Sequence, residues 1–424
     1  MKKEKDSENK TRTFYIHEFP GGWEVKKFED FAEIVMGQSP EGNTYNRTGE
    51  GLALINGPTE FTERHPIKIQ WTSSPTKICK KGDVLLCVRG SSTGRTNIAD
   101  DIYCIGRGIA AIRGKKNNDQ SYLEFQVERI VNQILKLTTG STFPNIDSKS
   151  LKSIKILLPP LPEQKAIARV LSTWDEAIHK TNQLIDQKEL RKKWLMQQLL
   201  TGKKRLPAFG GEWKEVKISE AFAFIKSYSF SRDNLTYDNP DADIYCIHYG
   251  DIHAVFENDI VDLKREINVP LLKKEFSNVE FEFLKDGDVI IADASEDYEG
   301  VGESIELVNV GKKKIIGGLH TIVLRDKNKL TAKSYRAYLF NGETVLNSLR
   351  KVATGISVYG ISKGNLAKIQ VILPSIEEQT AIAGILQVAD NEIQLLNKKL
   401  KELKEQKKGL MQVLLTGRKR LKQI

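Results

Sequence analysis

Two short stretches of the chain have residue types that hydrolytic chemistry uses. Residues 24–26 and 215–217 both read Glu-Val-Lys, which corresponds to the Glu-x-Lys half of a metal-dependent nuclease site. In such a site the carboxylate holds a divalent cation through oxygen ligands. Neither stretch follows a suitably placed aspartate, and alternating polar and apolar residues are also typical of the exposed face of an edge strand. We therefore interpret both stretches as edge strands, with a nuclease site as the alternative.

Other candidates for catalysis are weaker. His248 and His253 are too isolated from carboxylates and cysteines to predict a metal site. The phosphate-binding pattern GxxxxGK followed by Ser or Thr does not occur, nor does a GxGxxG that opens a helix after a strand. Residues 56–59, Asn-Gly-Pro-Thr, lack the second proline and the aromatic residue of an amino-methyltransferase motif. The sequence thus favours a chain without a catalytic site of its own.

Composition favours a cytoplasmic protein with a polyanionic partner. The chain has 65 Lys and Arg residues against 55 Asp and Glu residues, a net charge of +10 and a pI near 9.1. This excess favours nucleic-acid binding, and a solvated basic surface is the alternative explanation. No apolar run approaches the length of a membrane span. The cysteines lack metal-ligand or redox spacing, so we expect four reduced core residues: Cys79, Cys87, Cys104 and Cys246.

The elements that position these residues are revealed by a repeat. Residues 158–202 recur as residues 373–417, at a constant separation of 215 positions and without a gap. The shared residues are Leu-Pro at 158 and 373, Glu-Gln at 163 and 378, Asp at 175 and 390, and Leu-Thr-Gly at 200 and 415. A period so much longer than a solenoid unit indicates two large, similar halves.

Each repeated segment has the pattern of a long helix. Apolar residues recur at alternating steps of four and three, which is typical of a coiled-coil seam. Pro162 marks the start of the first helix, a Ser375–Glu378 capping box the start of the second, and Gly202 and Gly417 the ends. The predicted seam residues are Ile167, Leu171, Trp174, Ile178, Ile185, Leu195 and Leu199 in the first helix, and Ile382, Leu386, Ile393, Leu396, Leu400, Leu403, Leu410 and Leu414 in the second.

The helix lengths constrain the topology. A helix of about 40 residues spans roughly 60 Å. Only a short basic linker, residues 203–207, separates the first helix from the next globular segment, so that segment must begin near the far end of the rod. Burial of both seams within one molecule requires the helices to run antiparallel, which predicts a dumbbell. The alternative is that each seam packs only on its own globular domain.

The segments before the helices also resemble each other. Residues 22–26 match 213–217, residues 81–86 match 286–291, and residues 139–141 match 354–356. Buried strands are predicted at Val84–Val88, Ile109–Ile112 and Val289–Ala292, and a helix at Ser121–Leu137. The fold class we expect is therefore two α/β (mixed α+β) globular domains separated by two long antiparallel coiled-coil helices, with an internal pseudo-two-fold repeat.

In this order and at these lengths, the elements resemble the specificity subunit of a type I restriction-modification system. The resemblance covers residues 23–421 and includes the opening of the second half, Gly-Glu-Trp-Lys-Glu-Val-Lys at 211–217. It implies target-recognition domains that each recognise one half of a split DNA sequence, and conserved spacer helices that dock other subunits. The expected boundaries are a flexible tail at 1–13, recognition domains at 14–158 and 207–373, and spacer helices at 159–206 and 374–424.

The resemblance also implies the partners and the cofactors. We expect double-stranded DNA, two methyltransferase subunits and restriction motor-nuclease subunits as partners, no membrane, and a prokaryotic cytoplasmic location. This chain would be a non-catalytic scaffold without a cofactor or a metal, whereas its partner subunits would use S-adenosylmethionine, ATP and Mg²⁺. The DNA target should be bipartite and asymmetric, with half-sites centred roughly 10 base pairs apart if both domains use the same face of the groove. A self-sufficient restriction or modification enzyme is the alternative.

Polar turns after the matched strands are the places where we expect DNA contacts. Arginine in such a turn can bind a guanine edge or a phosphate. The candidates are Arg89, Ser91, Ser92, Arg95, Thr142, Asn145 and Lys149 in the first domain, and Ser295, Tyr298, Ser357, Tyr359 and Lys363 in the second.

Lys192 and Lys407 occupy the same heptad position of the two helices. A buried ammonium is costly, so we expect both to reach outward and dock an acidic patch of a methyltransferase subunit, with a solvated helix end as the alternative.

Overall fold

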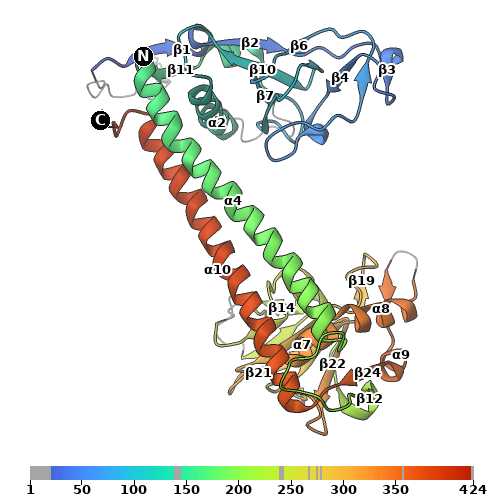
Figure 1. Cartoon of the computed structure of the whole chain (residues 1–424). Coiled ribbons are helices and arrows are strands. Elements are labelled where there is room, and N and C mark those ends of the chain that lie inside the picture. The colour runs from blue at the N-terminus through green and yellow to red at the C-terminus, as the bar shows by residue number, and fades with distance from the viewer. Residues whose placement is uncertain are drawn as a thin grey trace, which may run out of the picture. The chain divides into compact units, whose positions relative to one another are not determined.

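The structure is a computed structural model that describes residues 21–137, 145–237, 243–265, 268–273, 276, 279–355 and 358–421. The predicted tail at 1–13 lies outside the described residues. The chain divides into two compact units (Figure 1). Unit 1 comprises the residues up to Asn182 together with those from Lys398 onward, and unit 2 comprises Gln183–Asn397. None of the helices in the described part combines the length and the apolar character that a membrane span requires.

The described part of unit 1 contains two larger sheets, a two-stranded sheet and the long helix α2 (Gln120–Leu137). The first sheet has the antiparallel order β2-β10-β7-β8, and the second has the order β3-β5-β4-β9-β6, in which β4 and β9 are parallel. Helix α2 is the helix expected from residue 121 onward. The strands are β2 (Ala32–Met36), β3 (Tyr45–Asn46), β4 (Leu52–Ile55), β5 (Trp71–Thr72), β6 (Ile78–Cys79), β7 (Val84–Cys87), β8 (Thr96–Ile98), β9 (Tyr103–Ile105) and β10 (Ile109–Gly114).

Unit 2 repeats this plan with an enlarged first sheet. Its order is β13-β22-β18-β20-β16, so that β13, β22, β18 and β20 correspond to β2, β10, β7 and β8 of unit 1. A second sheet has the order β14-β17-β15-β21, and β19 pairs with β23. The strands are β13 (Phe222–Ile225), β14 (Leu235–Thr236), β15 (Ile244–Ile247), β16 (Ile260–Asp262), β17 (Leu271–Leu272), β18 (Val289–Ala292), β19 (Ala294–Ser295), β20 (Ser304–Val308), β21 (Lys314–Gly317), β22 (Thr321–Asp326) and β23 (Tyr359–Gly360).

Short helices complete each unit at matching places. In unit 1, α1 (Phe28–Phe31) follows the first strand and α3 (Ser148–Ser153) precedes the last. In unit 2, α5 (Ile218–Ala221) and α9 (Lys363–Lys368) take the same places. Unit 2 also has α6 (Tyr249–Ala254), α7 (Tyr335–Phe340) and α8 (Glu343–Val352). The matched elements confirm two mixed α/β domains.

The two Glu-Val-Lys stretches lie on short edge strands, as we predicted. Strand β1 (Glu24–Lys27) pairs antiparallel with β11 (Lys155–Leu158), and β12 (Lys214–Lys217) pairs in the same way with β24 (Gln370–Leu373). The exposed carboxylate of Glu24 forms an ion pair of 2.7 Å with Lys26, two residues later in the same strand. Among the described residues no cluster of three potential metal ligands occurs near them or elsewhere. The pairing explains both stretches without a nuclease site.

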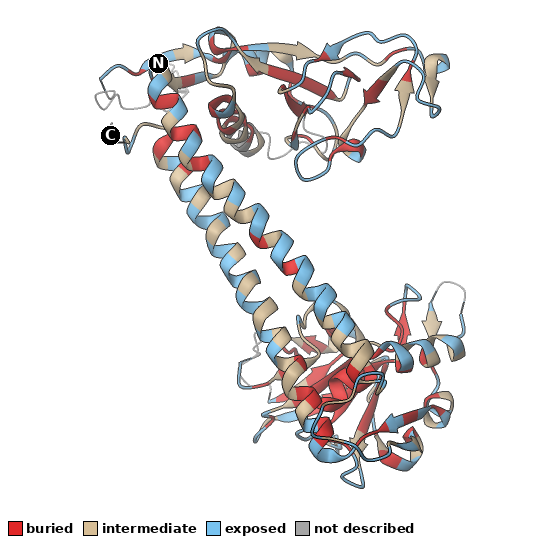
Figure 2. Ribbon diagram, in the orientation of Figure 1, coloured by how far each residue is buried: buried red, intermediate tan, exposed pale blue. Residues whose placement is uncertain are grey.

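The two repeated segments form helices of equal length, α4 (Leu161–Leu199) and α10 (Ile376–Leu414). Every predicted seam residue is buried or half-buried, whereas intervening positions such as Leu190 and Leu395 are 69% and 68% exposed (Figure 2). In unit 1 the first turns of α4 pack with the last turns of α10, and in unit 2 the reverse holds. The helices therefore run antiparallel in each unit. Their ends also contact the domain cores, so both predicted modes of seam burial occur together.

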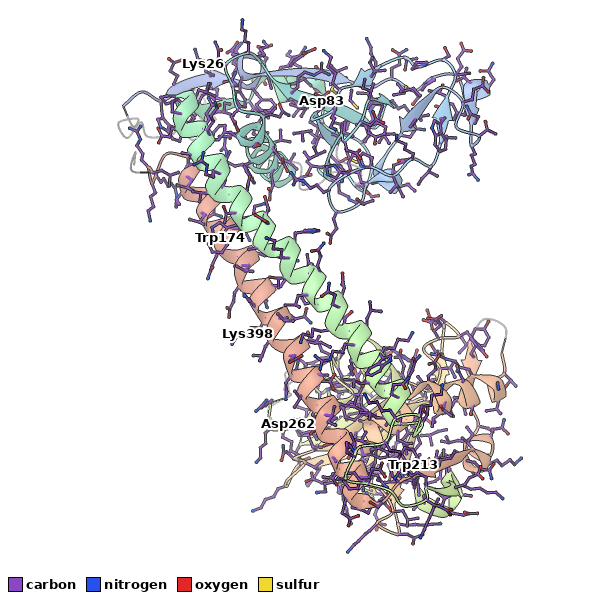
Figure 3. All side chains as sticks on the ribbon, in the orientation of Figure 1. Lys26, Asp83, Trp174, Trp213, Asp262 and Lys398 are labelled. Carbon is purple, nitrogen blue, oxygen red and sulfur yellow. The ribbon has the colours of Figure 1, made fainter. Side chains whose placement is uncertain are left out.

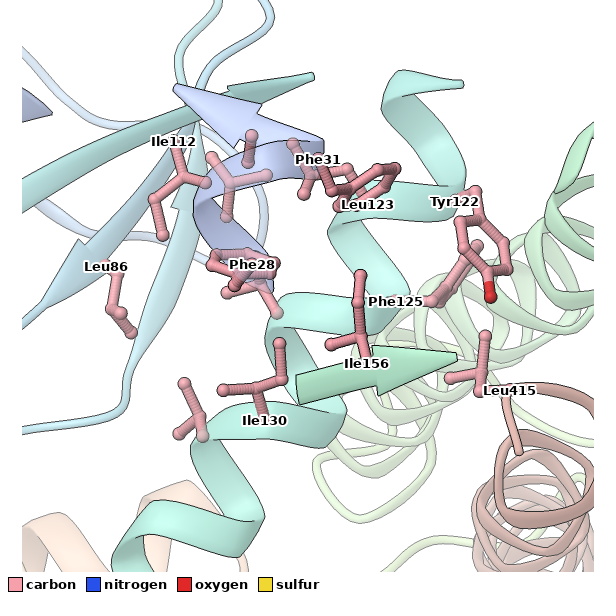
Figure 4. Close-up of a cluster of buried hydrophobic side chains, with 14 of the residues drawn as sticks. Phe28, Phe31, Leu86, Ile112, Tyr122, Leu123, Phe125, Ile130, Ile156 and Leu415 are labelled. Atoms are coloured by element: carbon pink, nitrogen blue, oxygen red, sulfur yellow. The ribbon is translucent and has the colours of Figure 1, made fainter. Parts of the chain in front are cut away.

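The core of unit 1 joins three parts of the chain. Phe28 and Phe31 of α1 pack against Tyr122 of α2, and the rings of Phe31 and Tyr122 meet edge to face at 6.2 Å (Figure 4). Leu415, which follows α10, is fully buried in the same cluster. Burial of this many apolar side chains supplies the main stabilisation of the unit. Helices α2, α4 and α10 therefore share one core with the strands of unit 1.

The ends of the long helices agree only partly with the sequence expectation. Gly202 and Gly417 follow the last turns with φ of +69° and +70°, the left-handed conformation expected of glycine at a helix end. At the start of α10 the hydroxyl of Ser375 accepts a bond from the backbone N–H of Glu378 at 3.3 Å. The Glu378 carboxylate, however, is bound elsewhere in unit 2, so the predicted capping box has only one of its two bonds.

Candidate nucleic-acid interface

In unit 1, the turn after β7 presents the predicted arginines to solvent. Cys87 and Arg95 are hydrogen-bonded at 2.8 Å, which closes a tight hairpin between β7 and β8. Arg89, Ser91 and Arg95 are exposed in this hairpin, and Ser92 is half-exposed. Arg89 forms an isolated antiparallel bridge with Asn145, which is also exposed. Two candidate segments far apart in the sequence thus meet at one edge of the sheet.

The candidates of unit 2 meet at the matching edge. Ser295 of β19 pairs with Tyr359 of β23, and the rings of Tyr359 and Tyr298 contact edge to face at 5.3 Å. Tyr298 is 45% exposed and Tyr359 is half-buried, and an exposed aromatic ring beside a polar loop offers a flat surface for contact with bases. Lys363 is exposed at the first turn of α9, and Lys149 is exposed at the equivalent helix α3 of unit 1.

Three candidates need correction or lie beyond the described residues. Ser295 is only 5% exposed, and its hydroxyl accepts a hydrogen bond from the backbone N–H of Asp297 at 3.3 Å. It therefore shapes the loop and does not fit a direct contact with DNA, because the short side chain points into its own turn. Thr142 and Ser357 lie outside the described residues.

A buried ion pair holds the start of the strand that leads into each of these turns. Asp83, labelled in Figure 3, belongs to the Gly-Asp-Val motif before β7. Its carboxylate lies 2.7 Å from Arg113 of β10. Asp288, in the motif before β18, lies 2.6 Å from Arg325 of β22. Both carboxylates are almost fully buried, and each also accepts a backbone N–H three residues earlier. Removal of either partner would leave an unpaired buried charge, so the pair holds the first residues of the strand, at the end away from the turn, in one position.

Histidine and carboxylate groups that sequence reasoning kept apart come together in unit 2. His253 Nδ1 lies 2.6 Å from Glu303 Oε2, and His320 Nδ1 lies 3.3 Å from Asp293 Oδ1. Our expectation that His253 is isolated from carboxylates was wrong, because Glu303 lies 50 positions away in the sequence but beside His253 in space. No metal-ligand cluster forms among the described residues. No spacing pattern in the sequence could have revealed these pairs.

The two helix lysines form ion pairs with carboxylates of this chain. Lys192 lies 2.6 Å from Asp390 and 3.6 Å from Asp259, whereas Lys407 lies 2.7 Å from Asp175 and 3.3 Å from Glu128. Burial lowers the pKa of both lysines, but the paired carboxylates outweigh it and raise each pKa above its usual value. The expectation that these lysines reach outward to a partner is corrected, because intramolecular carboxylates already meet both charges.

After each long helix, an arginine of the basic segment binds the glutamate in the first turn of the other long helix, and this contact occurs in both units. In unit 1, Arg420 donates two bonds to Glu163 at 2.7 and 3.1 Å, and the Trp23 indole donates a third at 2.9 Å. In unit 2, Arg205 donates two bonds of 2.7 Å to Glu378, and the indole of Trp213, labelled in Figure 3, donates a third at 3.2 Å. The repeated Glu-Gln pair is evident in the sequence, but this role of the glutamate is not.

Comparison with known proteins places these features in a family. The family described as "Type I restriction modification DNA specificity domain" matches residues 20–189 and 210–405. A putative type I restriction enzyme specificity subunit of Methanocaldococcus jannaschii is 40% identical over 45% of each chain. A second specificity subunit of that organism is 26% identical over 96% of this chain and 95% of its own length.

Solved structures share the fold. The specificity subunit of M. genitalium has a TM-score of 0.54 at 16% identity, covering 95% of this chain and 98% of that one. A chain of a type I restriction-modification system, solved to explain complex assembly and conformational transition, has a TM-score of 0.61 at 15% identity and is covered completely. At such low identity these two similarities establish the architecture alone.

Proposed function

Because this chain belongs to the family of type I restriction-modification DNA specificity subunits, which recognise the DNA target, we propose that its two globular domains bind the two halves of a bipartite, asymmetric sequence. The observation that carries this proposal is the contrast between matching turns. Both units hold the start of the strand before the turn with a buried Asp–Arg pair, at 2.7 and 2.6 Å. The turns then differ in chemistry, since Arg89 and Arg95 are exposed in unit 1 and Tyr298 in unit 2. Similar scaffolds with different exposed groups recognise different sequences.

The exposed basic side chains supply the general attraction to DNA. Arg89, Arg95 and Lys149 in unit 1 and Lys363 in unit 2 are all exposed near the turns. Contacts of this kind to phosphates raise affinity for any sequence and weaken as salt increases. An arginine that also reaches a guanine edge adds discrimination among bases. We propose that the arginines of unit 1 do both, whereas the two lysines contact phosphates only.

We further propose that the chain is a non-catalytic scaffold. Its relatives are called specificity subunits, which supports a role in recognition. The modification chemistry would then come from two methyltransferase subunits that use S-adenosylmethionine. Cleavage would come from restriction subunits that use ATP and Mg²⁺. The paired helices α4 and α10, whose outer faces remain exposed, are the surfaces we propose for docking the methyltransferase subunits.

Mapping of methylated bases tests the proposal. The chain is expressed with its neighbouring methyltransferase in a host that lacks other modification systems, and methylated positions are located across the genome. We expect one sequence with two unlike halves separated by unspecified base pairs. A continuous or palindromic sequence would contradict the proposal. Purified chain alone, incubated with DNA and either S-adenosylmethionine or Mg²⁺, tests the competing hypothesis of a self-sufficient enzyme, which predicts activity without partners.

A further inference from the structure

Asp293 lies where three segments of unit 2 meet. It follows β18, its backbone N–H donates to the carbonyl of His320 at 3.1 Å, and its carbonyl accepts from Ile361 N–H at 2.8 Å. The side chains add a contact of their own, because His320 Nδ1 lies 3.3 Å from Asp293 Oδ1. His320 is 49% exposed and Asp293 is 27% exposed, so both remain accessible at the edge that carries the candidate loops.

Unit 1 builds the same backbone junction from different residues. Val88 N–H donates to the carbonyl of Gly108 at 2.9 Å, and the Val88 carbonyl accepts from Ile146 at 2.9 Å. Val88 is fully buried. Asp293 and His320 thus stand where Val88 and Gly108 stand in unit 1. Since the junction forms with valine and glycine, the fold does not require an ionisable pair at this place.

The pair in unit 2 is held in a conformation that costs stability. His320 has φ of +55°, a left-handed backbone conformation that residues with a side chain rarely adopt. Burial raises the pKa of Asp293, whereas His320 and Lys363 lower it. The Tyr249 ring meets the His320 ring edge to face at 5.3 Å and restricts its movement. Strain and a partly buried charge at an exposed edge are typical of functional positions.

Unit 1 has no room for the equivalent histidine. A Cβ atom added to Gly108 would lie 2.6 Å from the backbone carbonyl oxygen of Asn56. The side-chain pair is therefore a feature of unit 2 alone. In unit 1 the exposed groups nearest the junction are the arginines of the hairpin, with Arg89 directly after Val88.

We propose that Asp293 and His320 form a base-recognition pair, in which the carboxylate selects a cytosine or an adenine at one position of the half-site bound by unit 2. This inference rests on the proposed function and names the group that confers specificity. An ionised carboxylate only accepts hydrogen bonds. In the major groove cytosine N4 and adenine N6 donate them, whereas guanine O6 and thymine O4 are acceptors that face a carboxylate unfavourably. His320 orients the carboxylate of Asp293. The positive charge of Lys363 offsets the repulsion between this carboxylate and the DNA phosphates.

The contrast with unit 1 follows from the same chemistry. Arginine donates only, and it matches the acceptors O6 and N7 of guanine. Unit 1 therefore presents donors at this edge, and unit 2 presents an acceptor. The two halves of one target would then differ in the kind of base edge that each domain selects.

The test uses the chain in complex with its methyltransferase and a pool of duplexes randomised in both half-sites. Wild-type complex first defines both halves by selection and sequencing. Asp293→Asn keeps the size of the side chain but adds a donor, which can meet guanine or thymine. We expect discrimination at one base pair of the unit 2 half-site to fall about tenfold or more. Recognition of the other half-site should stay unchanged and serves as an internal control.

A second variant and a matched control separate recognition from folding. The double change Asp293→Val with His320→Gly introduces the residue types that unit 1 has at the same junction, Val88 and Gly108. It should also reduce discrimination at that one base pair. Asp243→Asn removes an exposed, lysine-paired carboxylate at the other end of β21 and should leave both half-sites unchanged. An unchanged unit 2 half-site in both test variants would overturn this inference and leave the proposed function standing. Failure of the wild-type complex to select any bipartite sequence would overturn both.

Discussion

Lys192 of α4 and Asp390 of α10 form an ion pair of 2.6 Å inside unit 2. The pair of Lys407 and Asp175, at 2.7 Å, repeats it in unit 1 with the helices exchanged. Each helix thus contributes the lysine in one unit and the aspartate in the other. Charged groups at a single seam position specify the register of paired helices. The two ion pairs therefore fix how α4 and α10 align within each unit.

Replacement of Lys192 should destabilise unit 2. In Lys192→Met the carboxylates of Asp390 and Asp259 would face each other without a cation, and we expect a loss of roughly 1–3 kcal/mol in the free energy of unfolding. Denaturant unfolding of the purified chain measures it. Lys193→Met, at the exposed neighbouring position, is the control and should change stability by less than about 0.5 kcal/mol. Equal effects of the two changes would show that the ion pair contributes nothing.

A charge placed in the seam should disrupt helix pairing. Leu396 is half-buried in the seam of α10, whereas its neighbour Leu395 is 68% exposed. Leu396→Asp would bury an unpaired carboxylate and should cost roughly 2–4 kcal/mol. Leu395→Asp, one position along the same helix, should leave thermal unfolding almost unchanged. A Leu396→Asp protein that unfolds like the Leu395→Asp protein would contradict the packing of this seam.

The long helices were predictable because their information is local. Apolar residues at a fixed step, a proline at the start and glycines at the end all lie within one segment, and a second copy at a constant separation supported the pattern. The antiparallel course followed from burial of both seams. The partners of Lys192 and Lys407 were not predictable in the same way. Asp175 and Asp390 were noticed as repeated residues, but only the packed helices show that each faces the lysine of the other.

The candidate site was predictable only in outline. A glycine and an aspartate before a buried strand indicated a turn, and Arg89 is exposed there as expected. The orientation of single side chains depends on neighbours from distant strands, which is why Ser295 is buried against expectation. The approach of His320 to Asp293 depends on the turn between β21 and β22. Contacts of this kind have no spacing rule in the sequence.

The cysteines should be almost inert in the folded protein. All four are free and buried. Burial raises the pKa of Cys79 and of Cys246 to about 12, and that of Cys87 to about 11. A raised pKa reduces the thiolate fraction at pH 8, and the thiolate is the form that reacts. A colourimetric disulfide reagent at pH 8 should therefore label the native chain slowly and the denatured chain rapidly at four thiols. Rapid native labelling would contradict the predicted core positions.

Exchange of one recognition domain should change one half of the target. The core of unit 1 is formed by its own strands together with the ends of the helices, and Trp23 bonds Glu163 of α4 at 2.9 Å. A domain from a relative that keeps this tryptophan should therefore dock on the same helices when it replaces residues 14–157. Unit 2 keeps its own core and its own turn, so its half-site should be preserved.

Methylation mapping of the exchanged protein, expressed with the same methyltransferase, measures the result. We expect the half-site of the donor relative joined to the original half-site of unit 2. The matched control replaces residues 14–157 with the same donor segment in which tryptophan at the position of Trp23 is changed to phenylalanine. That change removes the indole donor to Glu163 and should weaken docking of the domain, hence lower the extent of methylation without altering its sequence. A change in both half-sites after a simple exchange would mean that the two domains do not recognise DNA independently.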